Sequence, residues 1–361
     1  MPAFSRVATL AIALLVAAPA QAADFFAGKQ LSILVNFPPG GSTDIESRLM
    51  SRHLAKHIPG NPAVIVRNMG GASGVIGMNW LGEIAAPDGL TFGYFTGAAA
   101  KAAFGEAGVR VDLSKMVYLA TGPSVLVNYV RTDTPPGIKV PADILKANPF
   151  WAVGLLPGTD KDVRMRLTLD LLGVKYRYLS NYPGSAEARL AVERNEVQMY
   201  TESVTTYRAS IESTLIKSGV AIPLWVDPLD DGEKYYGAPE AEGLPIKTYP
   251  DFYREVKGEP PKSIEWDAWR HSNFLGSVLQ RTLVLPPGSP KEAATILKTA
   301  IAALATDREY VEDAARTMGF SPKYLLDDKS EKVFKTVLNP EPRLKDFIAA
   351  YIEKGRASLG K

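Results

Sequence analysis

Apolar positions along this chain follow two periods in turn, and the switch between them predicts repeated strand–helix units. In LSILVNF, residues 31–37, apolar residues recur at every second position, as in a half-buried strand. The residues after it, Ile45, Leu49, Leu54 and Ile58, form one stripe along a helix. The other predicted strands are 63–66, 90–96, 150–156, 174–179, 197–200 and 221–226, and the other predicted helices contain 76–84, 163–171, 186–195 and a C-terminal group with 329–338 and 341–358. Strands that alternate with helices indicate an α/β protein whose mostly parallel sheets are flanked by helices.

The corners between these strands and helices are rich in glycine, proline and hydroxyl residues. Four of them share this composition: 38–44, 69–75, 157–160 and 183–185. A helix start leaves backbone N–H groups unpaired and carries partial positive charge, and glycine lets an anion approach. A single corner of this kind is more often explained by the steric demands of a strand-to-helix turn. Two from each half of the chain favour a shared site for a carboxylate or phosphate.

Local signals fix where some of these helices begin and end. Thr43-Asp44-Ile45-Glu46 fits a capping box, with Ser42 as a rival cap. Thr159 with Asp162 forms the same pattern, and Gly173 predicts the end of that helix.

The first 22 residues predict a secretory signal peptide. Arg6 precedes an apolar run from Val7 to Ala18, and Ala20-Gln21-Ala22 resembles a cleavage site, so we expect cleavage after Ala22. A membrane anchor is the alternative, but the run is short for a bilayer and small residues close it.

Composition narrows the class of function further. The chain has no cysteine, which excludes thiol nucleophiles, thiolate zinc sites and iron–sulfur clusters. Without the signal peptide it has 40 basic and 39 acidic residues, and so a net charge of +1. This balance does not indicate binding to nucleic acid or to a membrane surface. The remaining 339 residues suit two domains of ordinary size.

Several of these segments together resemble a known family. The sequence contains VNFPPGGSTDIESRLM, then VIVRNMGGASGVIG and APDGLTFGYFTG, and later GLLPGTDKDVRMRLTLDLLGVKYRYLSNYPGSAEARLAVERNEVQMYTES and LPPGSPKEAATILKTAIAALATD. In this order they resemble the Bug family, the periplasmic receptors of tripartite tricarboxylate transporters. The resemblance covers most of the chain after residue 22.

The resemblance implies a fold and a function. It implies a two-lobe periplasmic-binding-protein architecture of type II, a venus flytrap, with lobe one at 23–124 and 223–361 and lobe two at 125–222. Such a receptor would capture a small organic carboxylate in the periplasm and pass it to the permease subunits of its transporter. We expect a monomer without cofactor, metal or catalytic residues.

The resemblance also implies a set of ligand-binding residues. In the family, loops of the first lobe hold a carboxylate through backbone amides and bridging waters, without a cationic side chain. The matching positions here are Gly40, Gly41, Ser42, Asp44, Gly71, Ala72, Gly74, Gly158, Thr159 and Ser185, and Phe37, Ser73, Gly97, Glu202 and Ser203 complete the expected set. The chain departs from the family at Gly70, Ser73 and Glu202, in GAAAKAAF, and in the length and composition of 228–275.

An enzyme is the main alternative. A periplasmic serine hydrolase could use Ser73 with a histidine and Asp44, although GASGV lacks the second glycine of a nucleophile elbow. His53 and His57 lie four residues apart and could reach one metal, or they could line a solvated helix flank. No phosphate-loop or dinucleotide fingerprint follows any strand.

Other residues have a structural and a functional interpretation. Trp266, Trp269 and Phe274 could cap an aromatic ligand, but core packing is the commoner explanation. Glu202 could accept a ligand hydroxyl or ammonium, or cap a helix, or lie on the surface. Asp227, Asp230 and Asp231 are expected in a solvated loop, because their spacing does not fit a calcium site.

Overall fold

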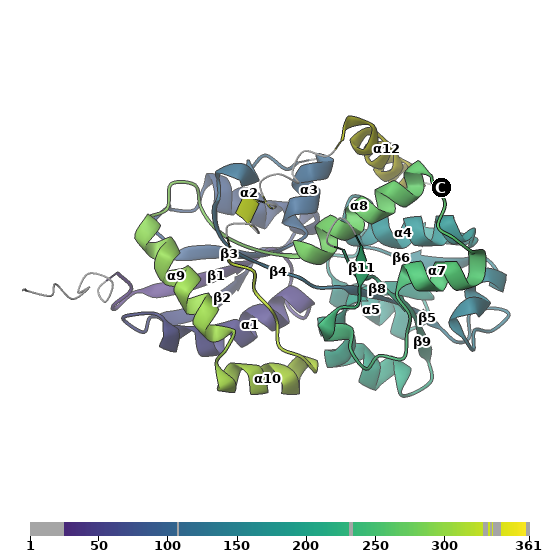
Figure 1. Ribbon diagram of the computed structural model, residues 1–361, viewed down its shortest axis with the longest axis horizontal. Coiled ribbons are helices and arrows are strands. Elements are labelled where there is room, and N and C mark those ends of the chain that lie inside the picture. Colours follow the sequence, from purple (N-terminus) through teal and green to yellow (C-terminus); the bar gives the residue numbers. More distant parts are fainter. Residues whose placement is uncertain are drawn as a thin grey trace, which may run out of the picture.

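A computed structural model describes residues 25–106, 108–230, 234–327, 331–332, 334 and 341–358. It contains two five-stranded sheets, each flanked by helices, which lie side by side along the long axis (Figure 1). The expected α/β fold with two lobes is confirmed. The predicted signal peptide lies outside the described residues, and no helix within them has the length and apolar character that a bilayer crossing needs.

The first sheet has the strand order β2-β1-β3-β12-β4. Strand β1 pairs in parallel with β2 and β3, whereas β12 runs antiparallel to both of its neighbours, so the sheet is mixed. Its strands are β1 (Gln30–Val35), β2 (Ala63–Asn68), β3 (Thr91–Thr96), β4 (Val117–Gly122) and β12 (Arg281–Leu285). Its helices are α1 (Ser42–Leu54), η1 (Ala55–His57), η2 (Ala72–Gly74), α2 (Val75–Glu83), α3 (Ala98–Phe104), η3 (Leu113–Lys115), α9 (Lys291–Leu304) and α10 (Arg308–Met318).

The second sheet has the order β7-β6-β8-β5-β9 and is mixed for the same reason, since β5 runs antiparallel to β8 and β9. Its strands are β5 (Leu126–Arg131), β6 (Phe150–Val153), β7 (Tyr176–Leu179), β8 (Met199–Ser203) and β9 (Ala221–Val226). Around it lie η4 (Pro141–Lys146), α4 (Asp160–Leu172), α5 (Ser185–Glu193), α6 (Val204–Thr206), the π-helix η5 (Tyr207–Ile216), β10 (Leu229–Asp230), β11 (Tyr235–Tyr236), η6 (Pro239–Ala241), α7 (Tyr249–Lys257), α8 (Ile264–Val278) and α12 (Pro342–Ala357).

The chain passes between the sheets at two adjacent points. The segment between β4 and β5 lies beside the end of α8, where Ser124 N donates to Ser277 O at 2.9 Å. Strand β9 continues the second sheet to Val226, and α8 packs along α4 of the same unit. We therefore propose that lobe two extends from about residue 125 to 278, past the boundary expected at 222/223.

The unusual segment 228–275 supplies much of the core of the second unit. Trp269 is fully buried and Trp266 is 7% exposed, and both contact the buried ring of Tyr249. These tryptophans therefore pack in the core. Each sheet has its own apolar layer as well: Ile33 with Leu49 in the first unit, and Val127 with Val192 in the second.

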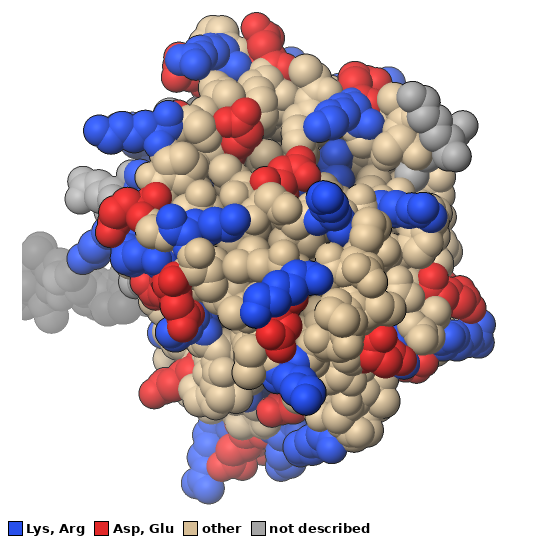
Figure 2. All heavy atoms as spheres, turned by 90° about the vertical axis from the view of Figure 1, so that its right-hand side faces the viewer, with Lys and Arg blue, Asp and Glu red and all other residues tan. Residues whose placement is uncertain are grey.

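The expected solvated loop around residue 230 is wrong. Asp227 and Asp230 are buried because each pairs with an arginine, Asp227 with Arg164 at 3.0 Å and Asp230 with Arg270 at 3.2 Å. Asp231 lies outside the described residues. Elsewhere charges of both signs are interspersed, as on the face in Figure 2.

Candidate ligand-binding site

An enclosed cavity of about 40 Å³ lies where the two lobes meet. Both units line it, and much of its wall comes from strand-to-helix corners. The lining residues are Phe37, Pro38, Gly41, Ser42, Thr43, Thr96, Lys101, Leu126, Leu155, Thr159, Asp160, Lys161, Ser185, Ser203 and Gln280. A volume of this size holds only a few water molecules, so a larger guest requires the lobes to move apart.

Helix N-termini from both lobes converge on this cavity. Helices α1 and α5 begin there at Ser42 and Ser185, and neither start has a side-chain cap in the described structure. Helix α4 begins beside them, capped by Thr159, whose hydroxyl accepts a hydrogen bond from Asp162 N at 3.1 Å. Uncapped N–H groups with the helix dipole behind them attract an anion, so this arrangement suits a carboxylate.

The two lobes touch at the corners that precede these helices. A Cβ added to Gly184 would lie 3.4 Å from the Pro38 ring, and one added to Gly40 would lie 3.6 Å from Ala186. The 36–41 corner and the 183–186 corner therefore close one side of the cavity by direct contact.

The α1 corner is held in shape by Asp44. Its carboxylate accepts hydrogen bonds from Gly40 N at 3.1 Å, from Arg48 at 3.0 Å and from Asn68 at 3.0 Å. Burial alone would raise the pKa of Asp44, but these hydrogen bonds outweigh it and leave the pKa below its ordinary value. Asp44 therefore fixes the loop and does not line the cavity.

Two lysines lie in the cavity wall, where the family resemblance implied none. Lys161 Nζ is held by Glu202 at 3.1 Å, the Tyr200 hydroxyl at 2.9 Å and Ser185 Oγ at 3.2 Å. Glu202 is buried beneath it in an ion pair, so the expected surface position is wrong, whereas its part in ligand binding stays a prediction. Lys101 comes from α3 and is 1% exposed. Burial lowers its pKa, and the acids around it offset only part of that effect.

A buried polar network lies behind the cavity. Thr43 and Thr96 share a hydrogen bond of 2.5 Å in the wall, and Thr96 accepts another from Arg281 at 3.0 Å. Arg281 in turn holds Glu46 through two hydrogen bonds, of 2.8 and 2.6 Å. Burial alone would raise the pKa of Glu46, but Arg281 outweighs it and keeps the pKa low.

The same carboxylate connects the lobes. Thr205 of α6 donates to Glu46 Oε1 at 2.5 Å, and Tyr94 donates to Oε2 at 2.8 Å. The predicted capping box at Thr43 is therefore wrong: the N-cap of α1 is Gly41, two residues earlier, and Glu46 points into the core, where Arg281 neutralises it.

The structure brings together six of the fifteen expected site residues. These six line the cavity: Phe37, Gly41, Ser42, Thr159, Ser185 and Ser203. Seven others are not among the residues that line it, and their part in binding stays a prediction: Gly40, Asp44, Gly71, Ala72, Ser73, Gly74 and Glu202. The 71–74 corner packs against the 36–41 corner, because a Cβ on Gly74 would lie 2.9 Å from Asn36 O. All four residues of the 71–74 corner have positive φ.

The remaining two expected residues face charged side chains. A Cβ on Gly97 would lie 2.8 Å from Asp160 Oδ1 and 3.1 Å from Lys101 Nζ. A Cβ on Gly158 would lie 1.5 Å from Glu106 Oε2, so the carboxylate of Glu106, from lobe one, lies against the corner that precedes α4. Arg356 holds the other oxygen of Glu106 at 2.8 Å.

Sequence reasoning missed Lys101, Lys161 and Gln280. Lys161 directly follows the predicted 157–160 corner, and Lys101 is the only charged residue in GAAAKAAF. The local sequence could therefore have indicated both lysines as site residues. Gln280 comes from the second crossing and had none.

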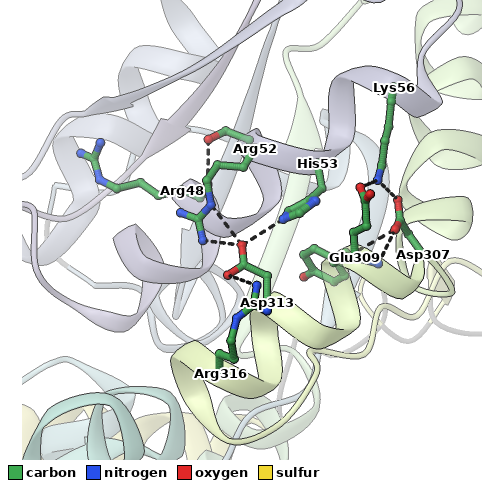
Figure 3. A network of polar contacts seen from close by, with 10 residues as sticks. Arg48, Arg52, His53, Lys56, Asp307, Glu309, Asp313 and Arg316 are labelled. Carbon is green, nitrogen blue, oxygen red and sulfur yellow. Dashed lines mark hydrogen bonds and ion pairs between the residues drawn. The ribbon is translucent and has the colours of Figure 1, made fainter.

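The histidines do not support the metal or hydrolase alternatives. His53 Nε2 lies 2.9 Å from Asp313 on α10 (Figure 3). His57 Nε2 lies 2.6 Å from Asp307, the N-cap of α10, so the two histidines contact different carboxylates. Both therefore join α1 and η1 to α10. Among the described residues, no group of acidic or histidine side chains is placed to hold a metal.

Comparisons with known proteins agree with this architecture. No family model matches the chain. A UPF0065 protein of Bordetella pertussis is 30% identical over 222 residues, 59% of this chain and 66% of that protein, slightly under two thirds of its length. A UPF0065 protein from the tcbD-tcbE intergenic region of a Pseudomonas species is 30% identical over 253 residues, 63% of this chain and 67% of that protein. Protein BugT of Bordetella pertussis is 43% identical over 76 residues, 21% of this chain and 22% of that protein.

Solved structures share the fold at low sequence identity. The periplasmic binding protein BugD has a TM-score of 0.64 and 17% identity, covering 92% of this chain and 98% of its own. An R. palustris protein solved with adipate has a TM-score of 0.64 and 18% identity, covering 92% and 98%. MatC of Rhodopseudomonas palustris, solved with malate, has a TM-score of 0.60 and 17% identity, covering 92% and 100%. The relative from the Pseudomonas species, matched over two thirds of its length, shows that the chain belongs to the family of UPF0065 and Bug proteins.

Proposed function

We propose that the protein captures a small organic carboxylate between its two lobes and delivers it to the permease of a tripartite tricarboxylate-type transporter. The observation that carries this proposal is the convergence of α1 and α5, from different lobes, with uncapped N-termini on one enclosed cavity. Two proteins of the same fold, solved with adipate and malate, support the ligand class.

Closure of the lobes is the proposed mechanism of capture. The ligand carboxylate binds the backbone N–H groups at Gly41 and Ser42 of lobe one and completes contacts to Ser185 of lobe two. A ligand that contacts both lobes at once stabilises the closed arrangement, because it gains contacts there that the open one lacks. No bond is made or broken, and the serine hydrolase alternative has no support in the placement of His53 and His57.

Location and partners follow from the same proposal. The chain is exported to the periplasm, with the signal peptide removed after Ala22, and acts there as a monomer.

A carboxylate panel tests the proposal. A ligand that binds only the folded protein raises its thermal midpoint in a saturable manner. We expect at least one small organic acid to do so, to give a matching Kd in calorimetry, and to be recovered unchanged after incubation. If no acid stabilises the protein, or if the acid or its ester is consumed, the proposal is wrong.

A matched pair of glycine variants locates the binding corner. Gly41 lines the cavity, and a Cβ there would meet no atom within 4 Å, so Gly41→Val fits the protein but takes space beside the α1 amides. Gly237 is exposed and equally free of neighbours, which makes Gly237→Val the control. We expect Gly41→Val to lose measurable binding with a cooperative fold, and Gly237→Val to bind as the wild type does.

A further inference from the structure

The ammonium of Lys101 is buried without a direct partner. Lys101 lies on α3, is 1% exposed and lines the cavity between the lobes. Within the described part of the chain, its Nζ takes part in no hydrogen bond or ion pair, and it lies 5.9 Å from the centroid of the Phe37 ring. Lys161, the other lysine of the wall, has three polar partners.

The acids near Lys101 are already engaged with other residues. Asp160 pairs with Arg164 at 2.8 Å, and Glu106 pairs with Arg356 at the same distance. Asp162 accepts a hydrogen bond from the Tyr178 hydroxyl at 2.7 Å. These carboxylates surround Lys101 at longer range and favour its protonated form, but none lies within ion-pair distance.

Such an arrangement is costly for the protein alone. Burying an ammonium without a paired charge or hydrogen bonds is unfavourable, which is why buried charges are normally paired. A side chain kept in that state in the wall of a cavity is a candidate for a role in binding.

Lys101 and the helix N-termini come from different parts of the wall. The uncapped starts of α1 and α5 lie where the 36–41 corner meets the 183–186 corner. Lys101 lies where Gly97 meets Asp160, that is, where α3 of lobe one faces α4 of lobe two. The cavity wall therefore contains two separate groups that attract anions.

We propose that Lys101 determines the specificity of the site by forming an ion pair with a second carboxylate of the ligand, which selects short dicarboxylates over monocarboxylates of similar length. This inference rests on the proposed capture of a carboxylate at the helix N-termini. It adds a side-chain contact that depends on this chain's own lysine within GAAAKAAF.

Matched ligands on the unmodified protein give the first test. Malonate, succinate and glutarate are each compared by calorimetry with their monoamides, which keep the length and lose one charge. We expect the best diacid to bind at least about 30-fold more tightly than its monoamide, which corresponds to about 2 kcal/mol, the lower end for losing one partner of a buried charge pair. Equal affinities would overturn the inference and leave the proposed function intact, whereas no binding of any acid would remove both.

The variant Lys101→Met gives the second test. It keeps the length of the side chain and removes its charge, and Lys345→Met on the exposed face of α12 is the control for charge removal. We expect Lys101→Met to lose the preference, so that it binds diacid and monoamide with equal affinity, and to unfold at or above the wild-type temperature. A preserved preference for the diacid would overturn the inference. A loss of monoamide binding would overturn it too, since Lys101 would then hold the only carboxylate.

Discussion

Replacing Glu46 by glutamine should unfold the protein at a clearly lower urea concentration, because Glu46 neutralises a buried guanidinium. Arg281 is 1% exposed, and its Nε and Nη2 atoms lie 2.8 and 2.6 Å from the Glu46 oxygens. The same carboxylate accepts hydrogen bonds from Tyr94 and Thr205. Glutamine keeps the shape of the side chain but leaves the charge of Arg281 uncompensated.

The size of the effect follows from the burial of both partners. Removing one member of a buried ion pair costs about 3–5 kcal/mol. Glutamine retains one oxygen that can still accept a hydrogen bond, so we expect a loss near the lower end, about 3 kcal/mol. Natural proteins are stable by about 5–15 kcal/mol, so this one substitution removes a substantial fraction of the total.

Urea titration followed by circular dichroism, without ligand, measures this loss. Glu312→Gln is the matched control, because Glu312 pairs with Arg308 on the exposed side of α10, where the loss should stay below about 0.5 kcal/mol. The double variant Glu46→Leu with Arg281→Met removes both charges and should be more stable than Glu46→Gln. A loss below about 1 kcal/mol for Glu46→Gln would refute the reasoning.

Two further predictions concern closure and pH. Thr205→Val removes the hydrogen bond that joins α6 of lobe two to Glu46 of lobe one. Because this bond favours the closed arrangement of the lobes, the ligand affinity measured by calorimetry should fall about tenfold without it. An unchanged Kd would show that the bond does not favour closure. Burial raises the pKa of Asp162 from its ordinary value of 3.8 to about 6, although Tyr178 and nearby cations oppose this. Because the folded-state pKa lies above the unfolded one, protonation stabilises the fold below pH 3.8, and this stabilisation is lost as the pH rises to about 6. The uncharged variant Asp162→Asn should therefore gain up to about 3 kcal/mol relative to wild type between pH 4 and pH 7 in urea titrations, and a difference that stays constant with pH would contradict the assignment.

The parts of the site that sequence alone predicted are those fixed by local chemistry. Thr159 caps α4, and Gly173 ends it with a positive φ of 70°, as the sequence indicated. The corners at 38–44, 157–160 and 183–185 all reach the cavity, because a strand followed at once by a helix places its corner at one edge of the sheet.

The parts that sequence missed depend on contacts between distant segments. Glu46 looked like a capping residue, but Arg281, 235 positions away, draws it into the core. The prediction that Asp227 is solvated failed for the same reason. Its partner, Arg164, lies on α4, far from Asp227 in the sequence. Strand β9 crosses the expected lobe boundary because it pairs with β5. No local sequence pattern reveals which strand β9 pairs with.

Glu106 places a fixed negative charge beside the corner that precedes α4. Its carboxylate lies against Gly158, just before α4 begins, and forms an ion pair with Arg356. The Oε2 atom of this carboxylate is buried and accepts no hydrogen bond within the described structure. Under the proposed function, we expect this fixed charge to repel a third carboxylate of the ligand, so citrate should bind more weakly than a dicarboxylate.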